Sequence, residues 1–292
     1  KNLRHHRDNT PGRAIPQKSN NHILIATWNI ANLGLQKRRD EDYELLSEII
    51  IWFDLVGIQE VYDDLKGLRE VQRFLPKSYR IVFNDKAGNN ERTAFVYDSD
   101  KISELEMIGE VAVPPSDMED INLPGIDRKY KGFDRNPYFV SFQAKNFDFV
   151  IANAHLFFGD DNTSDRERRA LEAYAVSRWA DLRRKSKNNY SKNFLVLGDF
   201  NLPKVEPSDL IYKALKKRGL QRPKHSSKIA SNIADDKDYD QIFFFPGATK
   251  QRFTGKGGIF DFDAKIFPDL WEQLDEDTIK FRSYVKYYLS DH

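Results

Sequence analysis

Short apolar runs rich in β-branched and aromatic residues alternate along the chain with segments of helical period. Such runs predict buried strands, and apolar residues three and four positions apart predict helices. The predicted strands cover 22–28, 54–59, 79–84, 92–98, 105–113, 139–143, 147–153, 194–197, 240–245 and 281–289. The predicted helices cover 41–53, 64–75, 165–184 and 207–218. This alternation favours an α/β fold in which two sheets, or one split sheet, are covered by helices.

The first 21 residues differ in their pattern from the rest of the chain, which suggests how the chain is divided. Residues 1–21 are polar, contain two prolines and lack an apolar period, so we expect a flexible N-terminal arm. Residues 22–292 contain no internal repeat and no linker, so we expect a single domain there. The first residue is Lys1 rather than Met, which fits a secreted or periplasmic protein that has lost an N-terminal leader; the sequence itself leaves the compartment open.

Composition narrows the class of protein. The 292 residues are 40% hydrophobic and 31% charged, which suits a large core and a soluble surface, and we expect a monomer. The net charge of +1 means that any anionic partner must be bound by local basic patches. The absence of cysteine excludes disulfides, zinc–thiolate sites and thiol catalysis. No apolar run reaches the roughly 18–20 residues of a membrane span.

Polar clusters stand at the ends of the predicted strands. They are Trp28-Asn29, Gln59-Glu60, Asn153-Ala154-His155, Gly198-Asp199-Phe200-Asn201, Asp240-Gln241-Ile242 and Asp291-His292. Acids, amides and histidines placed in this way predict one polar site on a hydrophobic scaffold. Hydrolysis of a phosphate ester needs such a set, because the anion must be neutralised, a water deprotonated and the leaving oxygen protonated. Mg²⁺ is usually held by one or two carboxylates, and Glu60 fits as the main one.

Two of the six histidines are candidates for chemistry. His155 ends a predicted strand and His292 follows Asp291, whereas the other histidines lie in the arm, at a strand start or in a basic loop. A histidine that acts as acid or base usually needs a carboxylate to fix its tautomer. The alternative for His155 is a hydrogen-bonded core histidine, and the alternative for Asp199 and Asn201 is an Asp-Asn turn.

The motifs WNI, QE, NAHL, GDFN, DQI and SDH occur in this order over residues 22–292. Together they resemble the endonuclease/exonuclease/phosphatase superfamily, and among its branches the deoxyribonuclease I-like proteins. The resemblance implies a four-layer α/β sandwich, with two packed mixed β-sheets flanked by helices and the site at one end. It also implies a Mg²⁺-dependent hydrolase of phosphate esters, with Mn²⁺ or Ca²⁺ as alternative ions.

The resemblance further implies roles for single residues. Close to the metal ion it places Glu60, Asn29 and Asp291. Around the phosphate it places Arg135, Asn29 and Asn201. Guanidinium groups make bidentate contacts to phosphate, which suits Arg135.

The acid–base residues implied by the resemblance form two dyads. In the first, His155 pairs with Glu91, and in the second, His292 pairs with Asp240. One histidine would serve as base and the other as acid, in an order that the sequence leaves open. Asp199 would orient the attacking water.

Two matches and two departures narrow the resemblance. Glu91-Arg92 before a strand and Arg135-Asn136-Pro137 before another are similar to deoxyribonuclease I-like proteins. Ala31 stands where apurinic/apyrimidinic endonucleases carry an acid, and DYDQI is shorter than the motif of inositol polyphosphate 5-phosphatases. We therefore expect a DNA endonuclease with little sequence specificity, with RNA as a further substrate.

Two alternatives remain open. One is an inositol-phosphate phosphatase or a sphingomyelinase-type phosphoesterase of the same superfamily. The other is a binding module without catalysis, against which the intact set of acids and histidines argues.

Three basic stretches are candidates for a DNA track, because phosphate contacts supply most non-specific affinity. They lie at residues 213–228, 183–187 and 250–256. We expect a track only if two of them flank the metal site; otherwise each is a solvated face.

Overall fold

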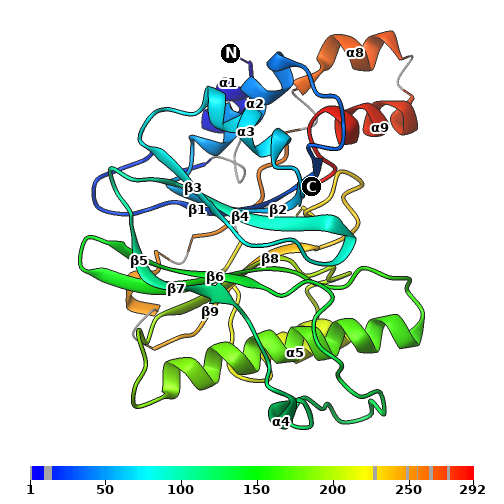
Figure 1. The fold of residues 1–292 in the computed structure, drawn as a ribbon. Helices are drawn as coiled ribbons and strands as arrows, with labels where there is room; N and C mark the ends of the chain where they lie inside the picture. Colours follow the sequence, from blue (N-terminus) through cyan, green and yellow to red (C-terminus); the bar gives the residue numbers. More distant parts are fainter. Residues whose placement is uncertain are drawn as a thin grey trace.

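Two β-sheets pack face to face in the computed structural model, which describes residues 2–9, 15–225, 229–247, 250–254, 256–262, 266–274 and 277–292 (Figure 1). The first sheet contains, in spatial order, β1 (Ile25–Leu33), β2 (Leu55–Tyr62), β4 (Glu91–Asp98) and β3 (Tyr79–Phe83). The second contains β5 (Ser103–Glu110), β6 (Tyr138–Ala144), β7 (Phe147–His155), β8 (Phe194–Asp199) and β9 (Asp240–Phe244).

Helices cover the outer face of each sheet (Figure 1). On the side of the first sheet lie α1 (Asn2–Asn9), α2 (Asp40–Ile50), α3 (Lys66–Phe74), α8 (Pro268–Gln273) and α9 (Thr278–Tyr288). On the side of the second lie α4 (Pro115–Met118), α5 (Thr163–Lys185) and α6 (Leu210–Lys216). The described residues also form two short 3₁₀ turns, η1 (Gly88–Asn90) and η2 (Lys250–Arg252). The predicted four-layer α/β sandwich is confirmed.

Apolar side chains fill the three spaces between these layers. The space between the sheets holds an aromatic-rich core that includes Phe95, Phe142 and Phe149. Outside it, the first sheet packs on α2 and α3, and the second sheet packs on α5 and α6. Strands buried on both faces read as continuous apolar runs, which is why the sequence pattern located most of them.

Strand direction brings the polar strand ends to one edge of the sandwich. β1 and β2 run parallel, as do β7 and β8, so their carboxyl ends coincide. β4 and β9 run antiparallel to β2 and β8, so their first residues lie at the same edge. Below that edge Gln59 Nε2 donates to Asn153 Oδ1 over 2.6 Å, and this buried amide pair joins the two sheets.

The predicted strand at 281–289 is wrong, because residues 278–288 form α9. Aromatic and β-branched residues made this segment look like a strand. Its buried residues Phe281, Val285 and Leu289 instead recur every four positions, which is a helical period. Asp277 begins the helix by accepting hydrogen bonds from the backbone N–H groups of Ile279 and Lys280.

Residues 2–9, at the start of the segment for which a flexible arm was expected, form the helix α1. Leu3 is buried in the core beneath the first sheet's helices, and Arg4 forms an ion pair with Glu48 on α2. His6 Nε2 lies 2.9 Å from the backbone carbonyl of Asp261. These contacts fix a segment whose composition alone gave no helical signal.

Among the described residues, no helix is both long enough and apolar enough to span a bilayer.

Candidate active site

Asp199 lies at the centre of the polar edge, at the end of β8 and almost fully buried. Its Oδ2 accepts a hydrogen bond from Asn29 Nδ2 at 2.9 Å, and its Oδ1 accepts one from the backbone N–H of Asn201 at 2.8 Å. Burial alone would raise the pKa of Asp199, but His292, His155 and these hydrogen bonds together hold it below the usual range. Asp199 is therefore an ionised acceptor held rigidly from two sides.

Gly198 allows the backbone to take the conformation that places Asp199 at the end of β8. Its φ is +137°, and an added Cβ would lie 1.8 Å from the backbone carbonyl oxygen of Ala154 on the neighbouring strand. Only glycine combines this backbone conformation with so close an approach.

Gly198→Ala is expected to destabilise the protein by about 2–4 kcal/mol, since backbone strain and overpacking each cost about 1–3 kcal/mol. Urea denaturation followed by circular dichroism measures the change. Gly125→Ala is the matched control, because Gly125 also has a positive φ, +80°, but open space around its Cβ position. Equal losses for both variants would show that the contact with Ala154 is unimportant.

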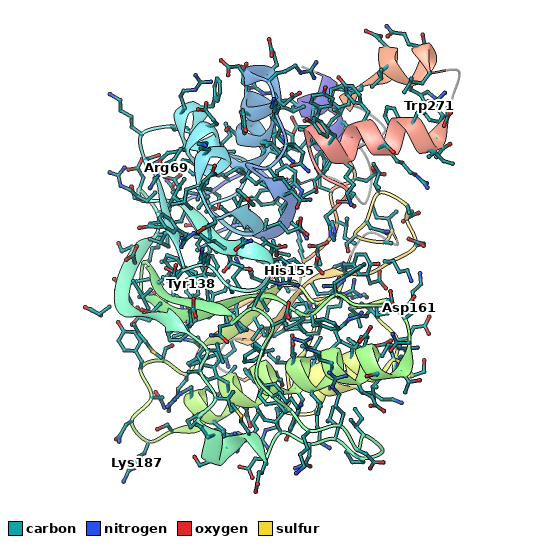
Figure 2. The ribbon with its side chains drawn as sticks, turned by 45° about the vertical axis from the view of Figure 1, so that its right-hand side comes forward. Arg69, Tyr138, His155, Asp161, Lys187 and Trp271 are labelled. Carbon is teal, nitrogen blue, oxygen red and sulfur yellow. The ribbon has the colours of Figure 1, made fainter. Side chains whose placement is uncertain are left out.

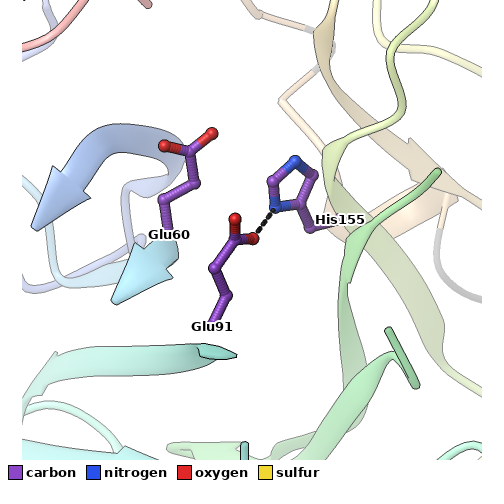
Figure 3. Close-up of side chains that lie close together, drawn as sticks. All are labelled: Glu60, Glu91 and His155. Carbon is purple, nitrogen blue, oxygen red and sulfur yellow. Dashed lines mark ion pairs between the residues drawn. The ribbon is translucent and has the colours of Figure 1, made fainter. Parts of the chain in front are cut away.

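The first histidine dyad joins β7 to β4. His155 Nδ1 lies 3.0 Å from Glu91 Oε2, and Figure 3 shows the two side chains facing each other with Glu60 beside them. The other ring nitrogen of His155, Nε2, lies 3.7 Å from Asp199 Oδ2. Burial would raise the pKa of Glu91, but contact with His155 and Arg135 lowers it, so Glu91 is an ionised partner that orients the ring.

The second dyad is placed by the C-terminal segment. His292 Nδ1 lies 2.6 Å from Asp240 Oδ2, and its Nε2 lies 3.9 Å from Asp199 Oδ2. Trp28 Nε1 donates to the His292 carbonyl over 3.0 Å, and the His292 backbone N–H donates to Ser290 Oγ over 2.9 Å. Burial would lower the pKa of His292, but Asp240 and Asp199 outweigh it and raise the pKa to about 10. The ring is therefore cationic at neutral pH.

Glu60 lies next to the first dyad, on a β-bulge of β2. Its φ is +58°, and the register between β2 and its neighbours shifts around it. Bulges re-aim side chains beside active sites, and here Glu60 turns toward Glu91 and His155 (Figure 3). Its Oε1 accepts from Asn29 Nδ2 at 2.9 Å and its Oε2 from the backbone N–H of Asn32 at 2.8 Å.

The donor set fits a divalent cation. One oxygen or nitrogen atom from each of Glu60, Glu91 and His155 lies within 4.8 Å of the others, and the same holds for Asp199, Asp240 and His292. Asn29 Oδ1 is buried between these groups and accepts no hydrogen bond from the described residues. An uncompensated buried carbonyl oxygen is costly, and a bound cation is one way to satisfy it.

Three residues named by the sequence make contacts within the protein that bear on their expected roles. Arg135 is buried and donates from Nε to the His155 carbonyl at 3.1 Å and from Nη2 to the Leu156 carbonyl at 2.9 Å, so it holds the His155 loop rather than offering a free fork to phosphate. The side-chain amide of Asn201 also donates to the Leu156 carbonyl, at 2.8 Å. Asp291 forms an ion pair with Lys286 and is absent from both carboxylate–histidine groups.

Two buried charges of α5 support the site and were missed in the sequence. Arg169 donates from Nε to the Phe157 carbonyl at 2.9 Å and from Nη1 to the Asn201 carbonyl at 3.2 Å, which ties together the loops that follow β7 and β8. Glu172 accepts the backbone N–H groups of Asp134 and Phe157, and burial raises its pKa to about 7. Charged residues on an otherwise apolar helical face were the only signal in the sequence.

The described parts of the basic stretches do not flank the site. Arg218, Arg184 and Lys185 all contact Asp181, near the C-terminal end of α5. That end of α5 leads into the start of β8, whereas the site lies at the end of β8. In Figure 2, Lys187 accordingly lies well away from His155.

The remaining basic loop lies at the same remote end. Arg252 Nη1 lies 3.4 Å from Asn146 Oδ1, in the turn between β6 and β7, and β7 reaches the site only at its other end. Lys228 and the Lys250 side chain lie outside the described residues. The condition for a DNA track, that two of these stretches flank the site, is therefore not met by the parts that the structure describes.

Solved structures share this fold. D. rerio TDP2 complexed with single-strand DNA product matches with a TM-score of 0.53 and 14% identity, over 78% of this chain and 85% of that one. A mannosyl-6-phosphatase from Bacteroides thetaiotaomicron matches with a TM-score of 0.52 and 18% identity, over 77% and 86%. An endonuclease/exonuclease/phosphatase family protein from the same organism gives 0.51 and 19%, over 77% and 83%.

No family model and no curated protein sequence matches the chain. At these identities the likeness establishes the fold, which is that of the endonuclease/exonuclease/phosphatase proteins, and the resemblance drawn from the motifs is confirmed at that level.

Proposed function

We propose that this protein is a divalent-metal-dependent phosphodiesterase, and specifically a DNA endonuclease with little sequence specificity. One observation carries the proposal. Two carboxylate–histidine dyads converge from opposite sides on one buried, ionised aspartate, with His155 Nε2 at 3.7 Å and His292 Nε2 at 3.9 Å from Asp199 Oδ2. Paired acid–base groups around a central carboxylate suit the proton transfers of phosphodiester hydrolysis.

A metal ion would be held by Glu60 and by the side-chain oxygen Oδ1 of Asn29. Asp291 would be a third ligand if its ion pair with Lys286 is broken. The bound ion would supply Lewis-acid neutralisation of the phosphate. Oxygen donors of this kind suit Mg²⁺ and also accept Mn²⁺ or Ca²⁺.

The side chains supply the remaining steps. Asp199, acceptor-only in its ionised state, orients an attacking water. His155, with Glu91 fixing its tautomer, and His292, with Asp240, exchange protons with the water and the leaving oxygen. Cationic His292 also offsets phosphate charge.

DNA is proposed as the substrate because the motifs around Glu91 and Arg135 resemble the deoxyribonuclease I-like branch. The fold is also shared with D. rerio TDP2, whose structure contains a single-strand DNA product. RNA offers the same phosphodiester chemistry.

A small phosphate ester is the second candidate. The remote position of the three basic stretches removes one argument for a long DNA track, and the fold is shared with a mannosyl-6-phosphatase. An inositol-phosphate phosphatase or a sphingomyelinase-type activity would use the same central residues.

A substrate panel tests the proposal. Supercoiled plasmid, single-stranded DNA, RNA, inositol phosphates and sphingomyelin are each incubated with Mg²⁺, Mn²⁺ or Ca²⁺ and with EDTA. We expect metal-dependent nicking of the plasmid that EDTA abolishes. Release of phosphate from the inositol phosphates, or of phosphocholine from sphingomyelin, with intact DNA would replace the proposal by the second candidate.

A further inference from the structure

A basic pocket of about 250 Å³ opens beside the polar edge of the sandwich, between the segment that precedes β6 and the first half of α5. Four cationic side chains and two aromatic rings contribute most of its lining: Arg128, Lys129, Lys131, Arg168, Tyr130 and Phe133. None of these residues belongs to the three basic stretches at the remote end of the sandwich.

The lysines carry the uncompensated charge of this pocket. Lys129 and Lys131 are exposed, and neither forms an ion pair or side-chain hydrogen bond with any residue that the structure describes. Arg168 is neutralised by Asp134, whose Oδ1 lies 2.7 Å from its Nη2. Arg128 donates to the backbone carbonyl and the hydroxyl of Ser164, which fixes it at the rim.

Aromatic packing makes the pocket wall rigid. The rings of Tyr130 and Phe133 meet edge to face with centroids 5.7 Å apart, and Tyr130 is buried against the second sheet's outer core. The Arg168 guanidinium carbon lies 3.8 Å from the centroid of Phe157, which follows His155 by two residues. A wall held in this way loses little freedom when a ligand binds.

A continuous series of contacts leads from the pocket to the catalytic centre. Arg168 contacts Asp134, and Asp134 Oδ2 lies 3.4 Å from Arg135 Nη1. The same Arg135 nitrogen lies 3.5 Å from Glu91 Oε2, which contacts His155. The pocket is therefore separated from the first dyad by only two side chains, Asp134 and Arg135.

We propose that this pocket binds a backbone phosphate of the nucleic-acid strand that neighbours the scissile phosphate, with Lys129 and Lys131 as its main contacts. The inference rests on the proposed function and extends it, since it assigns the phosphate-binding surface that the three basic stretches do not provide. Lysine contacts of this kind carry no base information, so recognition here is independent of sequence.

Binding in the presence of EDTA tests the pocket separately from catalysis. The anisotropy of a short fluorescein-labelled single-stranded oligonucleotide is titrated with the wild type and with the double variant Lys129→Ser/Lys131→Ser. We expect about tenfold weaker binding at low salt. The slope of log affinity against log salt should flatten by about 0.7, the contribution of one lost single-strand phosphate contact.

Lys77→Ser/Lys192→Ser is the matched control, because both lysines are exposed and precede strands at the end of the sandwich remote from the site. It removes the same charge and should leave both affinity and slope unchanged. Equal effects of the two double variants would reduce the pocket to a contribution of net charge and overturn the proposal. Hydrolysis of bis(para-nitrophenyl) phosphate should be the same in all three proteins.

The outcomes separate this proposal from the proposed function. If the oligonucleotide binds through the lysines but no nucleic acid is cleaved, the pocket stands and the endonuclease activity fails. If nucleic acid is cleaved but the Lys129→Ser/Lys131→Ser variant binds like the wild type, the pocket fails and the activity stands. If the wild type does not bind the oligonucleotide at any salt concentration, the pocket assignment is wrong.

Discussion

Replacing His292 or His155 by alanine is expected to lower the turnover of a phosphodiester substrate by about 10²–10⁴-fold, the usual contribution of a general acid or base. Each ring presents Nε2 to the same Asp199 oxygen, so loss of either ring removes one side of the proton-transfer arrangement. Single-turnover rates on a labelled oligonucleotide at saturating metal measure the chemical step directly.

The two histidine variants should remain folded. Without His155, Glu91 still lies 3.5 Å from Arg135 Nη1, and without the His292 ring the backbone carbonyl at that position still accepts from Trp28. His22→Ala is the control, because His22 is exposed and contacts only Ser19 Oγ among the interactions of the described residues. A histidine variant with near-normal turnover would exclude that histidine from the mechanism.

Strand ends explain why so much of the site could be predicted from the sequence. An apolar run that is followed by a polar pair marks both a buried strand and the edge at which it emerges, as Leu55–Tyr62 and Phe194–Asp199 do. β4 and β9 run antiparallel to their neighbours. Their first residues, Glu91 and Asp240, therefore lie at the edge where the neighbouring strands end. Periodicity alone could not show that; the order of the superfamily motifs supplied it.

The errors have a common physical cause, which is tertiary contact between segments distant in sequence. α1 is fixed by burial of Leu3 and by the Arg4–Glu48 ion pair, which no local pattern reveals. The contacts of Arg135 with backbone carbonyls of the loop after β7 are likewise contacts that no local pattern reveals. The three basic stretches likewise predicted a cationic surface, but their sequence did not show where the fold would place that surface.

The position of Lys129 and Lys131 also depends on the fold rather than on local charge. Their segment holds only three cationic residues between two aspartates, Asp127 and Asp134, so its net charge is unremarkable in the sequence. Folding brings it to the polar edge of the sandwich, while the longer basic stretches contact Asp181 and the β6–β7 turn at the opposite end. Distance from the site, rather than charge count, decides which cations can act on a substrate.

Glu60→Gln is expected to raise the Mg²⁺ concentration for half-maximal activity by about 10- to 100-fold. The substitution keeps the size of the side chain and one acceptor oxygen but removes the negative charge that a hard cation needs. Glu60 turns toward Glu91 and His155, and it is the carboxylate best placed to share an ion with Asn29 Oδ1. That oxygen is buried and has no partner among the described residues. Activity on a small phosphodiester over a Mg²⁺ titration measures the shift.

Two further variants make the metal test specific. Glu119→Gln is the control for loss of one negative charge, since Glu119 is exposed and lies before β6 in the short α4 region. Asp291→Asn separates two roles: as a metal ligand Asp291 would shift the titration as Glu60→Gln does, whereas as the ion-pair partner of Lys286 it would leave the titration unchanged. Oligonucleotide binding in EDTA should be retained by all three variants, because the lysines of the basic pocket are intact. A Glu60→Gln protein with the wild-type Mg²⁺ dependence would remove Glu60 from the metal site and with it the proposed position of the ion.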